Sequence, residues 1–343
     1  MMILSDELQH HVTRLLDNAG FVANHLRFIP CAKGGNNRTF RIEADDNVFA
    51  MKEYFRQPGD TRDRLASEFA FLQYAYQVAP ESVPFPYAKD AEEGLALYEF
   101  IEGSAIAADD VQAKDVDAAA TFFCALNQPA LKQQASDLSL ASEACFSIHE
   151  HIQLIDARIT KLQQLMPNCD EDLLAEALIK QLGQCWDKMI DRIQYQARVN
   201  HLDLSQTLLP DQRCISPSDF GFHNALRISD GRLRFLDFEY AGWDDPAKMV
   251  GDFFSQLAIP VPAHYFESFT EKVMQPFSDA SMLIERARIL RPVYQIKWCC
   301  IALNVFIPVN LARRKFANPA LNIVELKHNQ ILKAKSLLNQ LEI

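Results

Sequence analysis

The chain lacks the patterns on which several common kinds of site depend. Its eight cysteines include no Cys-x-x-Cys pair, so their spacing carries no zinc signature. Neither Gly-x-Gly-x-x-Gly nor Gly-Lys-Ser/Thr occurs, which excludes the dinucleotide fingerprint and the P-loop. No signal-peptide pattern opens the sequence, and no uninterrupted apolar run reaches the length of a membrane span. We therefore expect a cytoplasmic protein with reduced cysteines and no membrane partner.

Positive charge is also scarce. The sequence has 34 Lys and Arg against 45 Asp and Glu, a formal net charge of −11. Such a chain is a poor match for a nucleic-acid backbone, so we expect no nucleic-acid partner. A negative field favours a cationic small molecule, although many cytosolic proteins are equally acidic.

The length and the pattern of apolar residues predict two lobes. A chain of 343 residues is too long for one small core. Residues 1–101 show two or three strands between 28 and 54 and a helix over 62–75. From residue 102 to 343 the pattern is mainly helical. The predicted helices of this part cover 109–126, 149–165, 170–197, 247–254, 267–274, 282–306 and 323–341.

The most informative stretch lies between residues 219 and 239. Asp219 leads Asn224 by five positions, and Asp237 follows Asn224 by thirteen. Two short apolar segments flank a Ser229-Asp230-Gly231 turn, which predicts a hairpin with all three polar side chains at one end. Each residue alone is also an ordinary turn former. Together they match what a kinase needs: a carboxylate for the acceptor hydroxyl, and an amide and a carboxylate for Mg²⁺.

This segment resembles the catalytic core of the aminoglycoside phosphotransferase and choline kinase family. The usual loop of that family reads His-Gly-Asp, four further residues, then Asn. The resemblance implies that Asp219 is the catalytic base and that Asn224 and Asp237 bind magnesium. It also implies an α+β, bilobal, protein-kinase-like fold with a small antiparallel sheet and a larger helical lobe. The chain departs from the pattern at Pro217, where relatives usually carry a His that braces the loop.

The upstream part contains candidate contacts to the phosphates of ATP. Lys52 ends an apolar strand and matches the nucleotide-binding Lys of the family, and Glu68 lies on the following helix where a kinase carries its ion-pair partner. A loop before this strand resembles the Gly-Gly-x-x-Asn-Arg loop of the family, although alone it also fits a hairpin turn. The loop residues expected at the phosphates are Gly34, Gly35, Asn36 and Asn37.

A strand over 95–101 leads into the larger lobe and predicts the hinge. In a bilobal kinase, backbone groups at this place bind the adenine edge, so side-chain identity matters little. We expect such contacts from Glu99, Phe100 and Ile101, although Phe100 also suits a core position. The predicted boundary between the lobes therefore lies between residues 101 and 102.

The acceptor is the least defined part of the site. Aromatic and acidic residues suit an ammonium group, although aromatic residues of a helical lobe are usually core. The candidates are Glu239, Trp243, Asp244 and Trp298. Amino alcohols such as choline or ethanolamine, aminoglycosides and sugars all remain possible acceptors. We expect Asp252 to be a structural brace, because in this family the matching Asp bonds backbone amides of the catalytic loop.

The sequence thus predicts an ATP- and Mg²⁺-dependent kinase of a small-molecule hydroxyl. A nucleotide-binding pseudokinase that acts as a scaffold is the alternative, because Pro217 and the loop composition are unusual. A protein kinase is a third option, and the short interval between Asp237 and the next helix argues against it.

Overall fold

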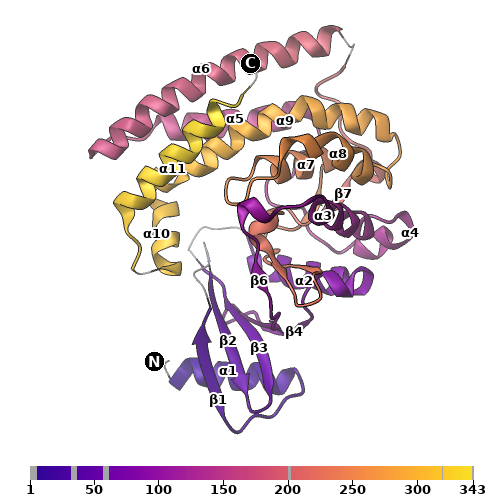
Figure 1. Cartoon of the computed structure of the whole chain (residues 1–343), viewed down its shortest axis with the longest axis vertical. Coiled ribbons are helices and arrows are strands. Elements are labelled where there is room, and N and C mark those ends of the chain that lie inside the picture. Colours follow the sequence, from indigo (N-terminus) through magenta and orange to yellow (C-terminus); the bar gives the residue numbers. More distant parts are fainter. Residues whose placement is uncertain (1–5, 32–36, 57–61, 200–201, 319, 342–343) are drawn as a thin grey trace.

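The structure is a computed structural model that describes residues 6–31, 37–56, 62–199, 202–318 and 320–341. It forms a small lobe built on a sheet and a larger helical lobe (Figure 1). The sheet is antiparallel, with strand order β1-β2-β3-β5-β4. Its strands are β1 (Leu26–Pro30), β2 (Arg38–Ala44), β3 (Asn47–Glu53), β4 (Pro86–Asp90) and β5 (Leu95–Glu99).

Alternating apolar residues give the sheet one buried face. Phe40, Ile42 and Met51 point into a core that Val12 and Leu15 complete from helix α1 (Asp6–Asn18). This period of two is what a half-buried strand requires. Helix α2 (Arg64–Val78) contacts the β4–β5 side of the sheet, and Asp63 caps its N-terminus through the Ala66 amide.

The large lobe contains most of the helices. They are α3 (Ala113–Leu126), α4 (Pro129–Lys132), α5 (Ile148–Gln163), α6 (Asp170–Val199), α7 (Pro246–Ser255), α8 (Phe266–Met274), α9 (Ala280–Leu303), α10 (Pro308–Ala317) and α11 (Ile323–Leu338). Helix α9 is central, since it packs on α5, α7 and α11. The expected helices are confirmed within a few residues, but the segment 109–126 begins with a 3₁₀ turn and α10 was not expected.

Short strands in the large lobe position the loops of the site. They are β6 (Ser104–Ala105), β7 (Cys214–Ser216), β8 (Ala225–Arg227), β9 (Leu233–Phe235) and β10 (Gly242–Asp244). The chain also has 3₁₀ turns at Pro80–Ser82, Ala108–Asp110, Gln133–Ala135, Pro210–Gln212, Phe222–Asn224, Ala263–Tyr265 and Asn304–Phe306. Strand β6 pairs with β8, so the chain leaving the first sheet docks directly on the β8–β9 hairpin. The predicted lobe boundary falls in the connection between β5 and β6 and stays a prediction.

None of the described helices is by itself long and apolar enough to cross a membrane. The bent pair Ala280–Phe306 and Pro308–Phe316, at 76°, meets that criterion by length and composition when the two are taken together.

Candidate active site

The hairpin brings the predicted metal ligands together. Strands β8 and β9 pair antiparallel, as expected, with Ala225 opposite Phe235. One residue further out, the Leu236 amide donates to the Asn224 carbonyl at 2.8 Å. Asn224 and Asp237 therefore leave the same end of the ribbon on neighbouring strands. The side-chain nitrogen of Asn224 donates to the backbone carbonyl of Asp219 at 2.9 Å, and this bond ties the loop that holds Asp219 to the hairpin.

Two backbone positions of this site have left-handed geometry. Asp237 has φ 65° and Ser218, directly before Asp219, has φ 64°. Such angles are uncommon for residues with a side chain, although Asp tolerates them better than most. Residues held in sparsely populated regions concentrate at functional sites, because surrounding contacts over-determine the backbone there. Both turns set the direction in which an acidic side chain leaves the chain.

Lys52 links the sheet to the hairpin. Its ammonium donates to Glu68 Oε2 at 2.6 Å and also contacts Asp237 Oδ1. Glu68 is itself held by the Tyr54 hydroxyl at 2.6 Å and by the Phe238 amide at 3.2 Å. A carboxylate with three donors is fixed in place, so Glu68 orients the ammonium. The predicted Lys52–Glu68 ion pair is thus present in the structure.

The electrostatics keep the key groups charged. Burial lowers the pKa of Lys52, but Asp237 and Glu68 act in the opposite direction and raise the pKa well above its usual value. Burial raises the pKa of Asp219, yet the adjacent His223 and the more distant Lys297 hold that pKa below its ordinary range. Asp219 is therefore an anion at neutral pH. Its side chain is 35% exposed, which leaves it open to a solute.

The oxygen atoms of Asn224 and Asp237 suit a hard cation. The Asp237 side chain is 40% exposed. The side-chain nitrogen of Asn224 donates to the Asp219 carbonyl, so the side-chain oxygen of Asn224 is left for another partner. Carboxylate and amide oxygens are the ligands that Mg²⁺ takes in proteins. Within the described ranges no group of three His, Cys, Asp or Glu could hold a metal. Mg²⁺ usually keeps several waters and takes phosphate oxygens beside one or two protein carboxylates.

The predicted phosphate-binding loop, residues 34–37, lies only partly within the described residues. Gly34, Gly35 and Asn36 lie outside the described residues. Asn37 is buried, and its side chain accepts from the Phe55 amide at 3.0 Å and donates to Glu239 Oε2 at 2.6 Å. Asn37 thus joins the two lobes through its side chain.

The expected hinge residues continue from the sheet into the large lobe. The Glu99 amide donates to the Phe85 carbonyl at 2.8 Å, and its carboxylate accepts from Arg234 at 2.8 Å. Phe100 lies beneath the Arg41 guanidinium at 4.9 Å, and Ile101 is buried. The Glu99 amide therefore has a protein partner, whereas the backbone of Phe100 and Ile101 stays a candidate for adenine contact.

The four acceptor candidates each have a partner within the protein. Glu239 and Asp244 are buried, and they pair with Asn37 and Lys248 respectively. Trp243 donates its indole N–H to the Ala135 carbonyl at 3.0 Å. The structure corrects the expectation that Glu239 and Asp244 contact the acceptor. Both carboxylates are buried and paired within the protein, so neither is open to a solute.

Trp298 is the acceptor candidate most directly linked to the catalytic loop. Its indole N–H donates to Asp252 at 2.8 Å, and Asp252 also accepts from Lys297 at 2.9 and 3.0 Å. Lys297 in turn affects the pKa of Asp219. Asp252 is thus a buried brace, as expected, but its partners are side chains of α9 in place of the expected loop amides.

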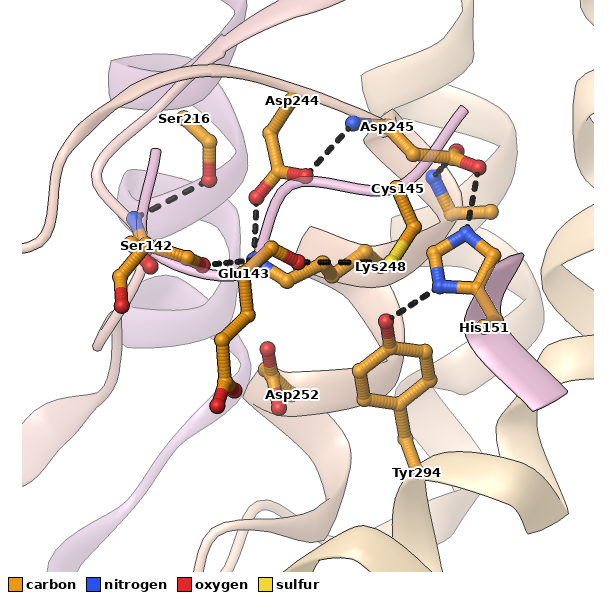
Figure 2. A network of polar contacts seen from close by, with 12 residues as sticks. Ser142, Glu143, Cys145, His151, Ser216, Asp244, Asp245, Lys248, Asp252 and Tyr294 are labelled. Carbon is orange, nitrogen blue, oxygen red and sulfur yellow. Dashed lines mark hydrogen bonds and ion pairs between the residues drawn. The ribbon is translucent and has the colours of Figure 1, made fainter. Parts of the chain in front are cut away.

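A buried polar network lies behind the site, and the sequence reading missed it (Figure 2). The Tyr294 hydroxyl lies 2.7 Å from His151 Nδ1, and His151 Nε2 lies 3.0 Å from Asp245 Oδ2. Asp245 also caps α7 through the Ala247 amide at 2.7 Å. The network holds the start of α7, shortly after Asp237. One signal was available: His151 falls at helical spacing among the buried residues of α5.

Comparison with known proteins gives the family. The model of the phosphotransferase enzyme family matches residues 27–271, more than half of the chain. The chain therefore belongs to the phosphotransferase enzyme family. A search of curated proteins gives no match.

Solved structures of the same fold include an ethanolamine kinase, a choline kinase and a spectinomycin phosphotransferase. An ethanolamine kinase of Plasmodium vivax has a TM-score of 0.57 and 11% identity, covering 90% of this chain and 81% of its own. A choline kinase of Cryptosporidium parvum gives 0.57 and 12%, covering 98% and 100%. A spectinomycin phosphotransferase, solved with ADP and spectinomycin, gives 0.57 and 14%, covering 96% and 99%. These likenesses confirm the bilobal, protein-kinase-like fold.

Proposed function

We propose that the protein transfers the γ-phosphoryl group of ATP to a hydroxyl group of a small molecule. The observation that carries this proposal is the convergence of Lys52, Glu68 and Asp237 at the end of the hairpin that also holds Asn224 and Asp219. Phosphoryl transfer depends mainly on positioning and on stabilisation of charge, and this set supplies both. The family and the fold neighbours, which include kinases of ethanolamine, choline and spectinomycin, support it.

Each residue has one role in the proposed reaction. Lys52, oriented by Glu68, binds phosphate oxygens of the nucleotide. Asp219 accepts the proton of the acceptor hydroxyl as that oxygen bonds to the γ-phosphorus and the bond to the ADP oxygen breaks. Asn224 and Asp237 would hold Mg²⁺, which neutralises charge on the phosphates when bound. Lys52 contacts Asp237 in this structure, so phosphate that takes the ammonium would leave the Asp237 carboxylate for the cation.

The acceptor is identified by a screen. The purified chain is incubated with ATP and Mg²⁺ over amino alcohols, aminoglycosides and sugars, and ADP release and the phosphorylated product are measured. Asp219→Asn is expected to abolish turnover while ATP binding, measured by calorimetry, stays unchanged. Asp230→Asn, in the exposed turn of the same hairpin, is the matched control and keeps full activity. An active Asp219→Asn variant would refute the proposed base.

Metal dependence is tested separately. Chelation of Mg²⁺ with EDTA is expected to abolish turnover and weaken ATP binding, and Asp237→Ala is expected to reduce the magnesium-dependent part of that binding. ATP affinity of Asp237→Ala that still responds fully to Mg²⁺ would contradict the role of this residue.

A further inference from the structure

His223 lies beside the proposed base. It belongs to the 3₁₀ turn Phe222–Asn224, and its Nε2 atom lies 3.3 Å from Asp219 Oδ1. The side chain is 20% exposed, and Nδ1 is buried with no hydrogen-bond partner among the described atoms. An imidazole with its proton on Nε2 fits this arrangement: the N–H faces the carboxylate, and the unprotonated nitrogen faces the protein.

Gly221 makes room for this imidazole. A Cβ atom at position 221 would lie 2.8 Å from His223 Nδ1 and 3.0 Å from its Cε1. The backbone of Gly221 is extended, with φ 173°, so any residue could adopt it. Space therefore explains the glycine better than conformation does. The chain has both the ring and the gap that lets the ring reach Asp219.

Other parts of the loop hold the Asp219 backbone more than its carboxylate. Asn224 donates to the Asp219 carbonyl, and the Ser216 hydroxyl accepts from the Ser218 amide at 3.0 Å. Pro217 has no side-chain donor. Lys297 lowers the pKa of Asp219, but its ammonium forms an ion pair with Asp252 at 2.9 Å. The imidazole is the side chain that lies at Asp219 Oδ1, and Asn224 also bonds the Asp219 carboxyl from its side chain.

We propose that His223 is a positioning residue for Asp219, in which Nε2–H holds Oδ1 and leaves Oδ2 for the acceptor hydroxyl. This inference rests on the proposed function, because it acts through the proposed base. A base must lie within hydrogen-bonding reach of the proton it takes, and small misplacement of a reacting group is costly. His223 therefore contributes to turnover without touching nucleotide or acceptor.

Substitution of His223 tests the proposal. His223→Ala is expected to lower kcat by about 10- to 100-fold, below the ~10²–10⁴-fold of a complete acid–base contribution. Because His223 does not contact the nucleotide, KM for ATP and the calorimetric affinity for ATP stay unchanged. His223→Gln is expected to restore most of kcat, since its amide nitrogen can occupy the place of Nε2. Thermal melts show whether each variant is folded.

Gly221 supplies the independent arm. Gly221→Ala is expected to displace the ring and to lower kcat as His223→Ala does, but to have no further effect in the His223→Ala background. Nitrogen-15 NMR of labelled histidine is expected to show the Nε2–H tautomer in the wild type and a changed signal in Gly221→Ala. An unchanged kcat in His223→Ala, failure of His223→Gln to restore it, or full additivity would overturn the inference. Absence of ADP release and of phosphorylated product from the wild type across the acceptor screen would instead refute the proposed function.

Discussion

Replacement of Asp245 by Asn tests how the buried network holds the start of α7. Asp245 is fully buried, and its Oδ2 atom accepts from Arg286 Nε at 2.6 Å and lies 3.0 Å from His151 Nε2. Its Oδ1 atom caps α7 through the Ala247 amide. Asn is also a good N-cap residue, so the cap survives the substitution. The variant therefore isolates the loss of the negative charge that faces Arg286.

The magnitude follows from the pKa of this carboxyl. Burial raises the pKa of Asp245, but Arg286 and His151 act more strongly and lower it from 3.8 to about 2. Each pKa unit corresponds to about 1.4 kcal/mol, so the charged form contributes on the order of 2–3 kcal/mol to stability. We expect Asp245→Asn to lose at least this much, because it leaves the Arg286 guanidinium buried without its carboxylate.

The assay is urea unfolding at a series of pH values. The folded pKa is depressed, so the stabilisation is complete above the unfolded value near 4 and is lost as pH falls toward 2. The gap between wild type and Asp245→Asn should be constant from pH 7 to 5 and shrink below pH 4. Asp191→Asn, exposed on α6, is the control with the same chemical change and no expected shift. A gap below about 0.5 kcal/mol, or one independent of pH, would refute the reasoning.

Two further substitutions test the contacts between the lobes. Lys52→Met should weaken ATP binding by about 10- to 100-fold in calorimetry, because one charge-assisted contact is lost, whereas Lys89→Met, exposed on the same sheet, should not. A normal ATP affinity in Lys52→Met would count against its role. Asn37→Ala should lower the free energy of unfolding by about 1–3 kcal/mol, since it removes the hydrogen bonds that Asn37 makes to buried Glu239 and to the Phe55 amide. The exposed Asn47→Ala is its control, and equal stability of both variants would contradict the proposed link.

The β8–β9 hairpin could be predicted because the residues that determine it are close together in the sequence. The turn at Ser229–Gly231 and the short apolar segments on either side fix the register, and the register fixes which residues share an end. The placement of Asn224 and Asp237 at one end of the hairpin follows from that geometry, whereas only the resemblance implies that they bind magnesium. The Lys52–Glu68 pair needed more, because its residues lie on different elements, and only the resemblance to a family related them.

Contacts between distant segments could not be predicted. Asn37 and Glu239 are 202 positions apart, and His151 and Asp245 are 94 apart. Periodicity shows which face of an element is buried but not which residue it meets. The prediction that Glu239 and Asp244 contact the acceptor therefore rested only on their being carboxylates. The Asp244–Lys248 ion pair could have been predicted, because Lys248 follows Asp244 by four positions.

The buried carboxylates acquire a common role once their partners are known. The segment from Asp237 to Lys248 is attached to the small lobe at its start, through Lys52 and the Glu239–Asn37 contact. At its end it is attached to the large lobe, through the Asp245–Arg286 ion pair and the hydrogen bond from Lys248 to the Ser142 carbonyl. Because a buried charge is costly unless paired, each attachment admits few alternative positions. The same segment carries Asp237, so these contacts set where the proposed metal ligand stands between the two lobes.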